Sequence, residues 1–401
     1  MSNPDPASLS KAPRSRGGVS EPITVSRGSE LRQDRIAEFV RLLQTMGPDI
    51  AGISRRMHVH EETLRYWYKE KLAKKGITHH AIPSYRRLGL ERAIVEIEFA
   101  PQYRPIATRI LSEMGERSYL GAFGKLLPSG IYYVVQRLPP HQAEDYDVFL
   151  SLLQKKGVLD QVHAPYGFSW SWTPPMRPEF YNFDSYSWEA SLDTNPRLSL
   201  REPTKARMSE FDLIDLKILE QLQVNASKSL KAISRKLGLN YQRTIRHYHH
   251  VVENNLIEGY SFNWLRTTVS PGSLTAPSHR HENLAMLFLV RNVNNHESRS
   301  LAQVFRRVPF LIYEGGGHDY VAQLFVPLRF VNEVLAYLQS GLPGFSERLR
   351  CLIVDQDSAL GFSIPADLYD ERTKRWVFEP NEAASKVERI IQEIRRSSKT
   401  G

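Results

Sequence analysis

The sequence predicts an α+β protein in which a three-helix unit and a mixed unit of strands and helices each occur twice. Between residues 208 and 265 the apolar residues recur at intervals of three and four, which is typical of amphipathic helices. The pattern from Ala93 to Phe99 alternates instead, which is typical of a strand. The segment Ile53–Met57 also resembles Ile233–Leu237 at an offset of 180 residues (233 minus 53). Such a fixed internal offset indicates a tandem duplication.

The clearest three-helix unit lies at residues 208–265. Its first predicted helix is followed by a break at Asn225–Ser229, and the second ends at Gly238, a residue suited to the left-handed conformation after a helix. Asn240 can cap a third helix, which is expected from about Tyr241 to Glu253. Three helices with a tight turn between the second and third form a helix-turn-helix unit. The third helix of such a unit usually reads the major groove of DNA.

This unit also carries a recognisable set of residues. The set is Asp212, Asp215, Lys217-Ile218-Leu219, Leu222-Gln223, Asn225-Ala226, Ser229, Ile233, Leu237-Gly238-Leu239 and Ile257-Glu258-Gly259-Tyr260. It resembles the signature of the Lrp/AsnC family of transcriptional regulators over nearly the whole unit. The resemblance implies that the DNA-binding unit is followed by a ferredoxin-like βαββαβ domain. In the family this domain assembles subunits and often binds an amino acid or a related small effector.

Composition limits the classes of protein to which the chain can belong. With 401 residues, of which 41% are apolar and 24% charged, the chain can form several globular domains. Its formal net charge of +9 favours a polyanion such as double-stranded DNA as a partner. A single cysteine, Cys351, excludes an intrachain disulfide framework, and no apolar run approaches the length of a membrane span. We therefore expect a cytoplasmic protein with no membrane partner.

The predicted units divide the chain into consecutive segments. These are a disordered basic tail at 1–29, a first helix-turn-helix domain at 30–85, a first ferredoxin-like domain at 86–172, a linker at 173–207 on a domain surface, a second helix-turn-helix domain at 208–266, a linker at 267–282, a second ferredoxin-like domain at 283–355, and a C-terminal extension at 356–401, irregular until an amphipathic helix at 382–396. Both mixed domains are expected in the order βαββαβ, with elements at 93–99, 106–114, 119–127, 131–138, 142–155 and 161–168, and again at 284–290, 298–307, 310–314, 320–326, 330–339 and 349–354.

The third helix of the second unit carries the residues expected to read DNA. One face, made of Thr244, Tyr248, Val251 and Val252, is expected to pack inward. The opposite face is polar and basic, and Arg can bond guanine, Gln can bond adenine, and either can bind phosphates. The alternative is a solvated polar face. The residues expected at DNA are Gln242, Arg243, Arg246, His249 and His250 on the third helix, with Lys228, Lys231, Arg235 and Lys236 on the second.

The first unit is expected to bind DNA less clearly, because it departs from the family pattern. His58 stands where the second unit has Gly238, and Glu61 and Glu62 begin the third helix, where phosphates would repel them. The residues expected to face inward are Leu64, Trp67, Tyr68 and Leu72. The residues expected at DNA are Arg55, Arg56, Arg65 and Lys69. The alternative is a degenerate copy with a structural role.

The most glycine-dense point of the chain is Gly315–Asp319. It lies between two predicted strands, so a hairpin turn is the simplest interpretation. In Lrp/AsnC proteins a similar hairpin helps to form the effector pocket, and the resemblance therefore makes Gly316, Gly317 and Asp319 candidates for binding an effector. The first copy has Gly130 and no Asp at this point.

Neither a metal site nor a catalytic group is expected. His247, His249 and His250 are not accompanied by a nearby cluster of Cys or carboxylates in the sequence. The pairs His79-His80 and His279 with His281 are expected in loops, and Cys351 is expected to be a buried, inert thiol. The aromatic run between Tyr166 and Trp188 has a strand-like period at its start, so it more often covers a sheet than stacks on bases.

These features together predict a sequence-specific, DNA-binding transcriptional regulator that responds to a small-molecule effector and is not an enzyme. No cofactor is expected. One chain would supply both halves of a pseudo-symmetric dimer, with further homo-oligomerisation left open, and its DNA site would be asymmetric because the two third helices differ. Two alternatives stay open. One is an enzyme on the same scaffold, since sirohaem decarboxylases resemble Lrp/AsnC proteins, and the other is an assembly protein that does not bind DNA.

Overall fold

The computed structural model describes residues 27–115, 118–189, 192, 208–262 and 283–397. The predicted tail up to residue 26, the linker at 267–282 and His279 with His281 lie outside these residues. The first helix, α1 (Arg27–Met46), begins inside the segment predicted as tail, so residues 27–29 are helical rather than disordered. No helix among the described residues is both long and apolar enough to span a membrane.

The described part of the structure contains two three-helix units. The second consists of α6 (Leu213–Val224), α7 (Leu230–Leu237) and α8 (Tyr241–Glu253). The first consists of α1, α2 (Ile50–Met57) and α3 (Glu61–Trp67), and α3 continues through a π turn and a 3₁₀ turn to Lys75. Gly238 and His58 both adopt the left-handed conformation after the second helix of their units, at φ 65° and 52°. This conformation strains the backbone of any residue with a Cβ. The first unit therefore tolerates this strain at His58, whereas glycine at position 238 avoids it in the second unit.

Both mixed units follow the order βαββαβ, and the predicted α+β class is confirmed. The first unit contains β2 (Glu91–Phe99), α4 (Ala107–Gly115), β3 (Leu120–Leu127), β4 (Tyr132–Leu138), α5 (Ala143–Lys155) and β5 (Leu159–Val162). The second contains β11 (Asn283–Val290), α9 (Asn295–Phe305), β12 (Leu311–Gly316), β13 (Tyr320–Pro327), α10 (Val331–Gly341) and β14 (Arg350–Gly361).

The strands of both mixed units form one ten-stranded sheet, because β3 pairs with β14 across the middle. The path ends at β7 (Trp170–Trp172), which pairs with β12. The aromatic run therefore begins with an edge strand, while β6 (Tyr166–Gly167) pairs with β2. Strand β14 is longer than predicted and reaches Gly361. Cys351 on β14 is exposed, which corrects the expectation of a buried thiol.

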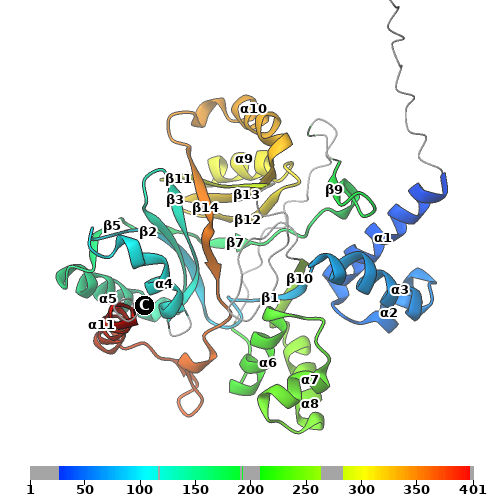
Figure 1. The fold of residues 1–401 in the computed structure, drawn as a ribbon, viewed down its shortest axis with the longest axis horizontal. Coiled ribbons are helices and arrows are strands. Elements are labelled where there is room, and N and C mark those ends of the chain that lie inside the picture. Colours follow the sequence, from blue (N-terminus) through cyan, green and yellow to red (C-terminus); the bar gives the residue numbers. More distant parts are fainter. Residues whose placement is uncertain (1–26, 116–117, 190–191, 193–207, 263–282, 398–401) are drawn as a thin grey trace, which may run out of the picture.

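A two-stranded ribbon joins the helical units. It consists of β1 (His79–Pro83) and β10 (Ile257–Phe262), which follow the third helices of the first and second units and pair antiparallel. Helix α6 packs on β1 and α1 packs on β10, so each unit contacts the other's strand. Figure 1 shows this ribbon between the two helical units and beneath the large sheet. The expectation that His79-His80 lies in a loop is therefore wrong, because β10 supplies the pairing partner from a distant part of the sequence.

His79 is completely buried in this ribbon, between the rings of Tyr260 and Phe262 at 5.0 and 4.9 Å. Its Nε2 lies 3.0 Å from the carbonyl oxygen of Leu43, which can only accept, so Nε2 carries the proton. The Nδ1 atom is buried and has no hydrogen-bond partner. Burial lowers the pKa of His79 to about 4, although the bond to Leu43 opposes the shift. The imidazole is therefore neutral at pH 7.

Acidification is expected to destabilise the protein through His79. The unfolded chain takes up this proton near pH 6.5 and the folded protein only near pH 4, so stability falls as the pH drops through this window, by about 3 kcal/mol in total. The melting temperature of a His79→Phe variant should fall less between pH 6.5 and 4 than that of the wild type. His141→Phe, which removes an exposed histidine, is the control. An equal fall in all three proteins would contradict the assignment.

The segment predicted as a surface linker contributes to the core. Its described part forms a small hairpin of β8 (Tyr181–Asn182) and β9 (Ser187–Trp188), and Phe183 at its turn is completely buried. The Trp188 ring packs on Phe310 of the second mixed unit at 5.3 Å. The main-chain N–H of Phe183 donates to the side chain of Gln33 on α1. This hairpin thus attaches the first helical unit to the second mixed unit.

The C-terminal extension attaches the second helical unit to the first mixed unit. It is not irregular after residue 355, because it forms a hairpin of β15 (Tyr369–Asp370) and β16 (Arg375–Trp376), followed by α11 (Pro380–Ser397). The Tyr369 ring packs on Phe211 at 5.1 Å, next to α6, while the Trp376 indole donates to the carbonyl oxygen of Leu88 at 2.8 Å. Helix α11 packs on α4 and α5. Each helical unit therefore shares its buried core with the mixed unit of the other half of the chain.

The two hairpins share a sequence pattern. Tyr181 and Trp188 are followed 188 residues later by Tyr369 and Trp376 (369 minus 181, and 376 minus 188). Tyr186 and Lys374, at the same offset, both have positive φ, at 55° and 53°. A tyrosine followed seven residues later by a tryptophan was the signal that could have revealed the second hairpin.

Candidate nucleic-acid interface

Helix α8 is positioned by local contacts that the sequence predicts well. The Asn240 side chain accepts from the N–H of Gln242 and caps the helix, and Gly238 ends the preceding one. Thr244 and Val251 are completely buried against the other helices. Val252 was expected inward as well, but its side chain is 45% exposed, because the helix buries a narrower stripe than the spacing suggested.

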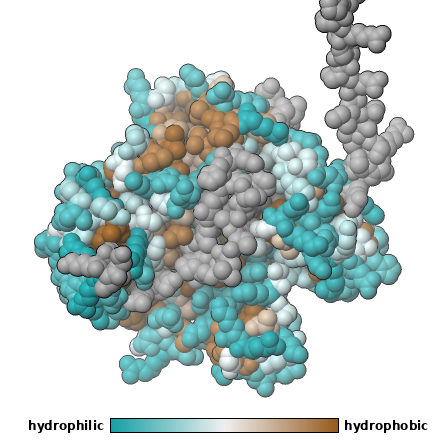
Figure 2. Space-filling view, viewed as in Figure 1, coloured by the Kyte–Doolittle hydropathy of each residue, from teal (hydrophilic) through white to brown (hydrophobic). Residues whose placement is uncertain are grey.

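The predicted DNA-binding residues of this unit lie on the outer surface of α7 and α8. Figure 2 shows that the outer surfaces of both helical units are mostly hydrophilic. His250 is half-buried, and Lys228 is also partly covered. The residues that are exposed are Lys231, Arg235 and Lys236 on α7, and Gln242, Arg243, Arg246 and His249 on α8. Their contact with DNA stays a prediction, but their exposure and charge suit it.

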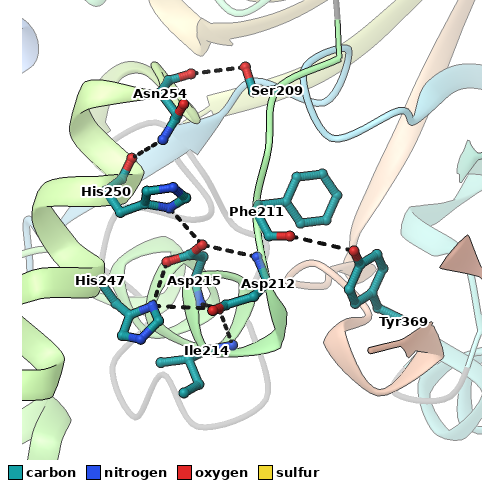
Figure 3. Close-up of polar contacts among 9 residues, drawn as sticks. All are labelled: Ser209, Phe211, Asp212, Ile214, Asp215, His247, His250, Asn254 and Tyr369. Atoms are coloured by element: carbon teal, nitrogen blue, oxygen red, sulfur yellow. Dashed lines mark hydrogen bonds and ion pairs between the residues drawn. The ribbon is translucent and has the colours of Figure 1, made fainter. Parts of the chain in front are cut away.

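A cluster of two histidines and two aspartates ties α8 to the start of α6 (Figure 3). The Asp215 carboxylate, which is completely buried, accepts from Nδ1 of His247 at 2.9 Å and from Nδ1 of His250 at 2.8 Å. Asp212 caps α6 by accepting from the N–H groups of Ile214 and Asp215, and Asp215 accepts from the N–H of Asp212 in return. His247 Nδ1 lies 3.5 Å from an Asp212 oxygen.

This cluster restrains the orientation of α8. A carboxylate can only accept, so both imidazoles carry a proton on Nδ1 and present Nε2 away from Asp215. The expectation that no carboxylates accompany these histidines is wrong, because the fold brings Asp212 and Asp215 next to His247 from a distant part of the sequence. One ligand atom from each of these three residues could reach a common metal ion. Both oxygens of Asp215 and one oxygen of Asp212 already accept N–H bonds, however, so the four residues form a hydrogen-bonded network as they stand.

The cluster lies at the floor of a shallow hollow in the proposed DNA-facing surface. The hollow has a volume of about 590 Å³, and it is lined by Asp212, Arg243, Arg246, His247 and His250. The two arginines project beside the histidines held by Asp215. The hydrogen-bonded network therefore supports the same helix face that presents the guanidinium groups.

The first unit has a different surface. Leu64 and Leu72 are completely buried and Trp67 is 8% exposed, as expected, while Tyr68 is half-buried. The predicted DNA-binding residues Arg55, Arg56, Arg65 and Lys69 are all exposed. Arg65 forms an ion pair with Glu61 at 3.1 Å, so a phosphate would compete with this carboxylate for the guanidinium. The positions 180 residues before Asp215 and His247 hold Arg35 and Trp67, so the first unit builds no equivalent cluster there.

The glycine-rich hairpin predicted to bind an effector connects β12 and β13. A Cβ on Gly316 would lie 2.4 Å from the Trp170 ring, and Gly317 has φ 157° close to the backbone of Ser169. The Asp319 carboxylate is buried and accepts from the N–H groups of Gly167 and Asn292 at 3.1 and 3.0 Å. These contacts give Gly316, Gly317 and Asp319 a structural role in the hairpin. A role of Gly316, Gly317 and Asp319 in binding an effector stays a prediction.

A comparison with solved structures finds proteins that are similar to this chain. The siroheme decarboxylase NirDL is similar at 11% sequence identity and a TM-score of 0.49, covering 90% of this chain and 99% of that one. Its co-complex with an iron-uroporphyrin III analogue is similar at 9% identity and a TM-score of 0.48, with the same coverage. PH0061 is similar at 11% identity and a TM-score of 0.29, covering 37% of this chain and 95% of that one. A search of curated proteins gives no match.

The expectation that this chain is not an enzyme is corrected by this comparison. The two structures that cover 90% of the chain are of a siroheme decarboxylase. At 9 to 11% identity the likeness concerns the fold alone.

A protein-family model matches one of the two helical units. Residues 211–258, which contain α6, α7 and α8, match the family described as winged helix-turn-helix DNA-binding. The predicted helix-turn-helix DNA-binding domain is therefore confirmed for the second unit.

Proposed function

We propose that this protein is a sequence-specific transcriptional regulator of the Lrp/AsnC type that reads double-stranded DNA with α8. The observation that carries the proposal is the exposed basic face of α7 and α8, which lies within the segment matching the winged helix-turn-helix model. Arg243 and Arg246 are one helical turn apart, so both can enter one major groove. The cations of α7 then lie near the phosphates that flank this groove.

We further infer that the chain arose by tandem duplication and acts as a pseudo-symmetric dimer. The order of elements recurs in both halves, and β3 pairs with β14 where two subunits would otherwise meet. Because α3 begins with Glu61 and Glu62 whereas α8 begins with Tyr241 and Gln242, the two units would contact DNA differently. The binding site is therefore asymmetric, with half-sites separated by about one helical turn of DNA or a multiple of it.

Replacing Arg243 and Arg246 together with alanine is expected to weaken DNA binding by more than about ten-fold. Each arginine that bonds a base edge contributes about 1–3 kcal/mol of discrimination, and each phosphate contact contributes about 0.9 to the slope of log affinity against log salt. The measurement is fluorescence anisotropy with genomic duplexes over a salt series, followed by selection of the preferred sequence. The double variant should bind more weakly and, if both arginines contact phosphates, with a slope smaller by about 2.

A variant with Lys155 and Arg389 replaced by alanine is the control. It loses the same formal charge from exposed positions on α5 and α11, which lie away from both helical units in Figure 1. This control should bind DNA nearly as the wild type does. Equal losses in both variants would show that only net charge matters, and no binding at low salt would reject the proposed function.

A further inference from the structure

A cavity of about 170 Å³ lies where the β1–β10 ribbon meets the large sheet. Strands β2 and β4 provide one wall, β12 and β13 another, and the last residues of α6, Gln223 and Val224, close one side. The cavity is therefore bordered by both mixed units and by the second helical unit. Much of its lining is apolar and comes from Ala81, Ile82, Val135, Ile312, Phe325 and Phe362.

Two arginines face this cavity side by side. Arg92 and Arg137 are directly opposite each other on β2 and β4. Both guanidinium groups lie over the ring of Tyr85, at 4.3 and 4.5 Å from its centre. Like charges directly opposite each other on paired strands are destabilising, so this arrangement favours the binding of an anion.

The protein leaves these cations partly unsatisfied. The Nε atoms of Arg92 and Arg137 are buried and have no hydrogen-bond partner. One terminal nitrogen of Arg137 donates to the carbonyl oxygen of Phe362 at 2.8 Å. Among the described residues that line the cavity there is no Asp or Glu. Glu258 acts on Arg92 from β10, but it is exposed and does not line the cavity.

The phenol of Tyr313 does not neutralise the charges of Arg92 and Arg137 either. Burial raises the pKa of Tyr313, so its hydroxyl stays protonated near pH 7. Burial and the neighbouring charge of Arg92 lower the pKa of Arg137 to about 10, which still leaves it charged at that pH. The cavity is thus lined by two cations and by several apolar side chains.

We propose that this cavity is a binding site for a small organic carboxylate. The carboxylate group bridges Arg92 and Arg137 and accepts from their free N–H groups, because guanidinium and carboxylate match each other in planar, paired hydrogen bonds. The apolar body of the ligand lies against Val135, Ile312 and Phe325. A cavity of about 150 Å³ is large enough to hold benzene, so a compound with one small ring or a short branched chain fits here.

This site differs from the hairpin at Gly316–Asp319, and it contacts the DNA-binding unit. The Gln223 amide, at the end of α6, donates to the Tyr85 hydroxyl at 2.9 Å, and its oxygen accepts from the N–H of Ile364. A ligand between the arginines touches the ring of Tyr85 and, through it, α6. If the proposed function holds, occupation of the cavity changes the affinity for DNA, since both ligands then act on the position of α6.

The test measures the thermal stability of the full-length protein with three probes. These are benzoate, which has both the carboxylate and the apolar body; benzamide, its neutral counterpart; and inorganic phosphate, an anion with no apolar body. A ligand that binds the folded state raises the melting temperature. Benzoate is expected to raise it in a concentration-dependent way, benzamide not at all, and phosphate less than benzoate. Isothermal titration calorimetry then gives the affinity.

Arg137→Gln and Arg92→Gln are expected each to weaken benzoate binding by about ten-fold or more, because each removes a charge-assisted hydrogen bond. Arg389→Gln, on the exposed face of α11, is the matched control and should bind as the wild type does. Circular dichroism checks the folding of each variant. The comparison of benzoate with benzamide needs no variant, so the test remains decisive if a substitution prevents folding.

Several outcomes would overturn the proposal. They are no effect of millimolar benzoate, equal effects of benzoate and benzamide, equal effects of phosphate and benzoate, or unchanged benzoate binding in both folded arginine variants. All these measurements are made without DNA. The result for the cavity can therefore be interpreted even if the proposed DNA-binding function is disproved. Anisotropy with and without benzoate then measures the coupling.

Discussion

Replacing His247 and His250 together with alanine is expected to destabilise the protein by about 3–5 kcal/mol. Asp215 is completely buried, and in the wild type its oxygens accept from both imidazoles and from the N–H of Asp212. The double variant leaves this carboxylate buried with the single backbone donor. An uncompensated buried charge is among the largest penalties that a substitution can create, because water cannot solvate it.

Chemical denaturation of the variant provides the measurement, with the midpoint and the slope fitted separately. His249→Ala is the matched control, since this neighbouring histidine on α8 is exposed and no hydrogen bond to Asp215 involves it. The control should change stability by no more than about 0.5 kcal/mol. If the double variant loses no more stability than His249→Ala, then His247 and His250 do not compensate the buried charge of Asp215. DNA binding should fall with the double variant even at temperatures where it is folded, because α8 loses two of the hydrogen bonds that orient it against α6.

Separating the two halves of the chain is expected to have a still larger effect. A cut between residues 193 and 207 should yield two fragments of which neither folds cooperatively alone. The N-terminal fragment loses Trp376 and α11, which cover its mixed unit, and the C-terminal fragment loses Phe183 and Trp188. Removal of one such aromatic side chain costs about 3–5 kcal/mol, against a total stability of about 5–15 kcal/mol for a typical domain.

Mixing the two fragments should restore the native fold, because all contacts between the halves are then available again. Near-ultraviolet circular dichroism and size-exclusion chromatography of each fragment, alone and mixed, provide the measurement. The uncut protein is the reference. Cooperative unfolding of either fragment alone would contradict the shared cores, and would indicate instead that each half is an independent folding unit.

Local features of the sequence determined much of the second helical unit. Asn240 and Gly238 mark helix ends through hydrogen bonds and backbone angles that involve only neighbouring residues, so the bounds of α7 and α8 agree with the prediction. The strands were predictable for a similar reason, since alternation of side chains between two faces is a local pattern. The βαββαβ order followed from these patterns in sequence.

The candidate sites depended on contacts between distant residues, which local patterns do not encode. Asp215 meets His247 only because α6 and α8 pack together, although an aspartate in the first turn of α6 and two histidines three residues apart on α8 were visible signals. Arg92 and Arg137 become neighbours only through the register of β2 and β4. The sequence by itself thus predicted the α+β class, the βαββαβ order of the mixed units and a helix-turn-helix DNA-binding domain in the second helical unit. The tertiary structure alone decided the ribbon of β1 and β10, the exchange of cores between the halves and the cationic cavity, because each depends on packing between distant segments.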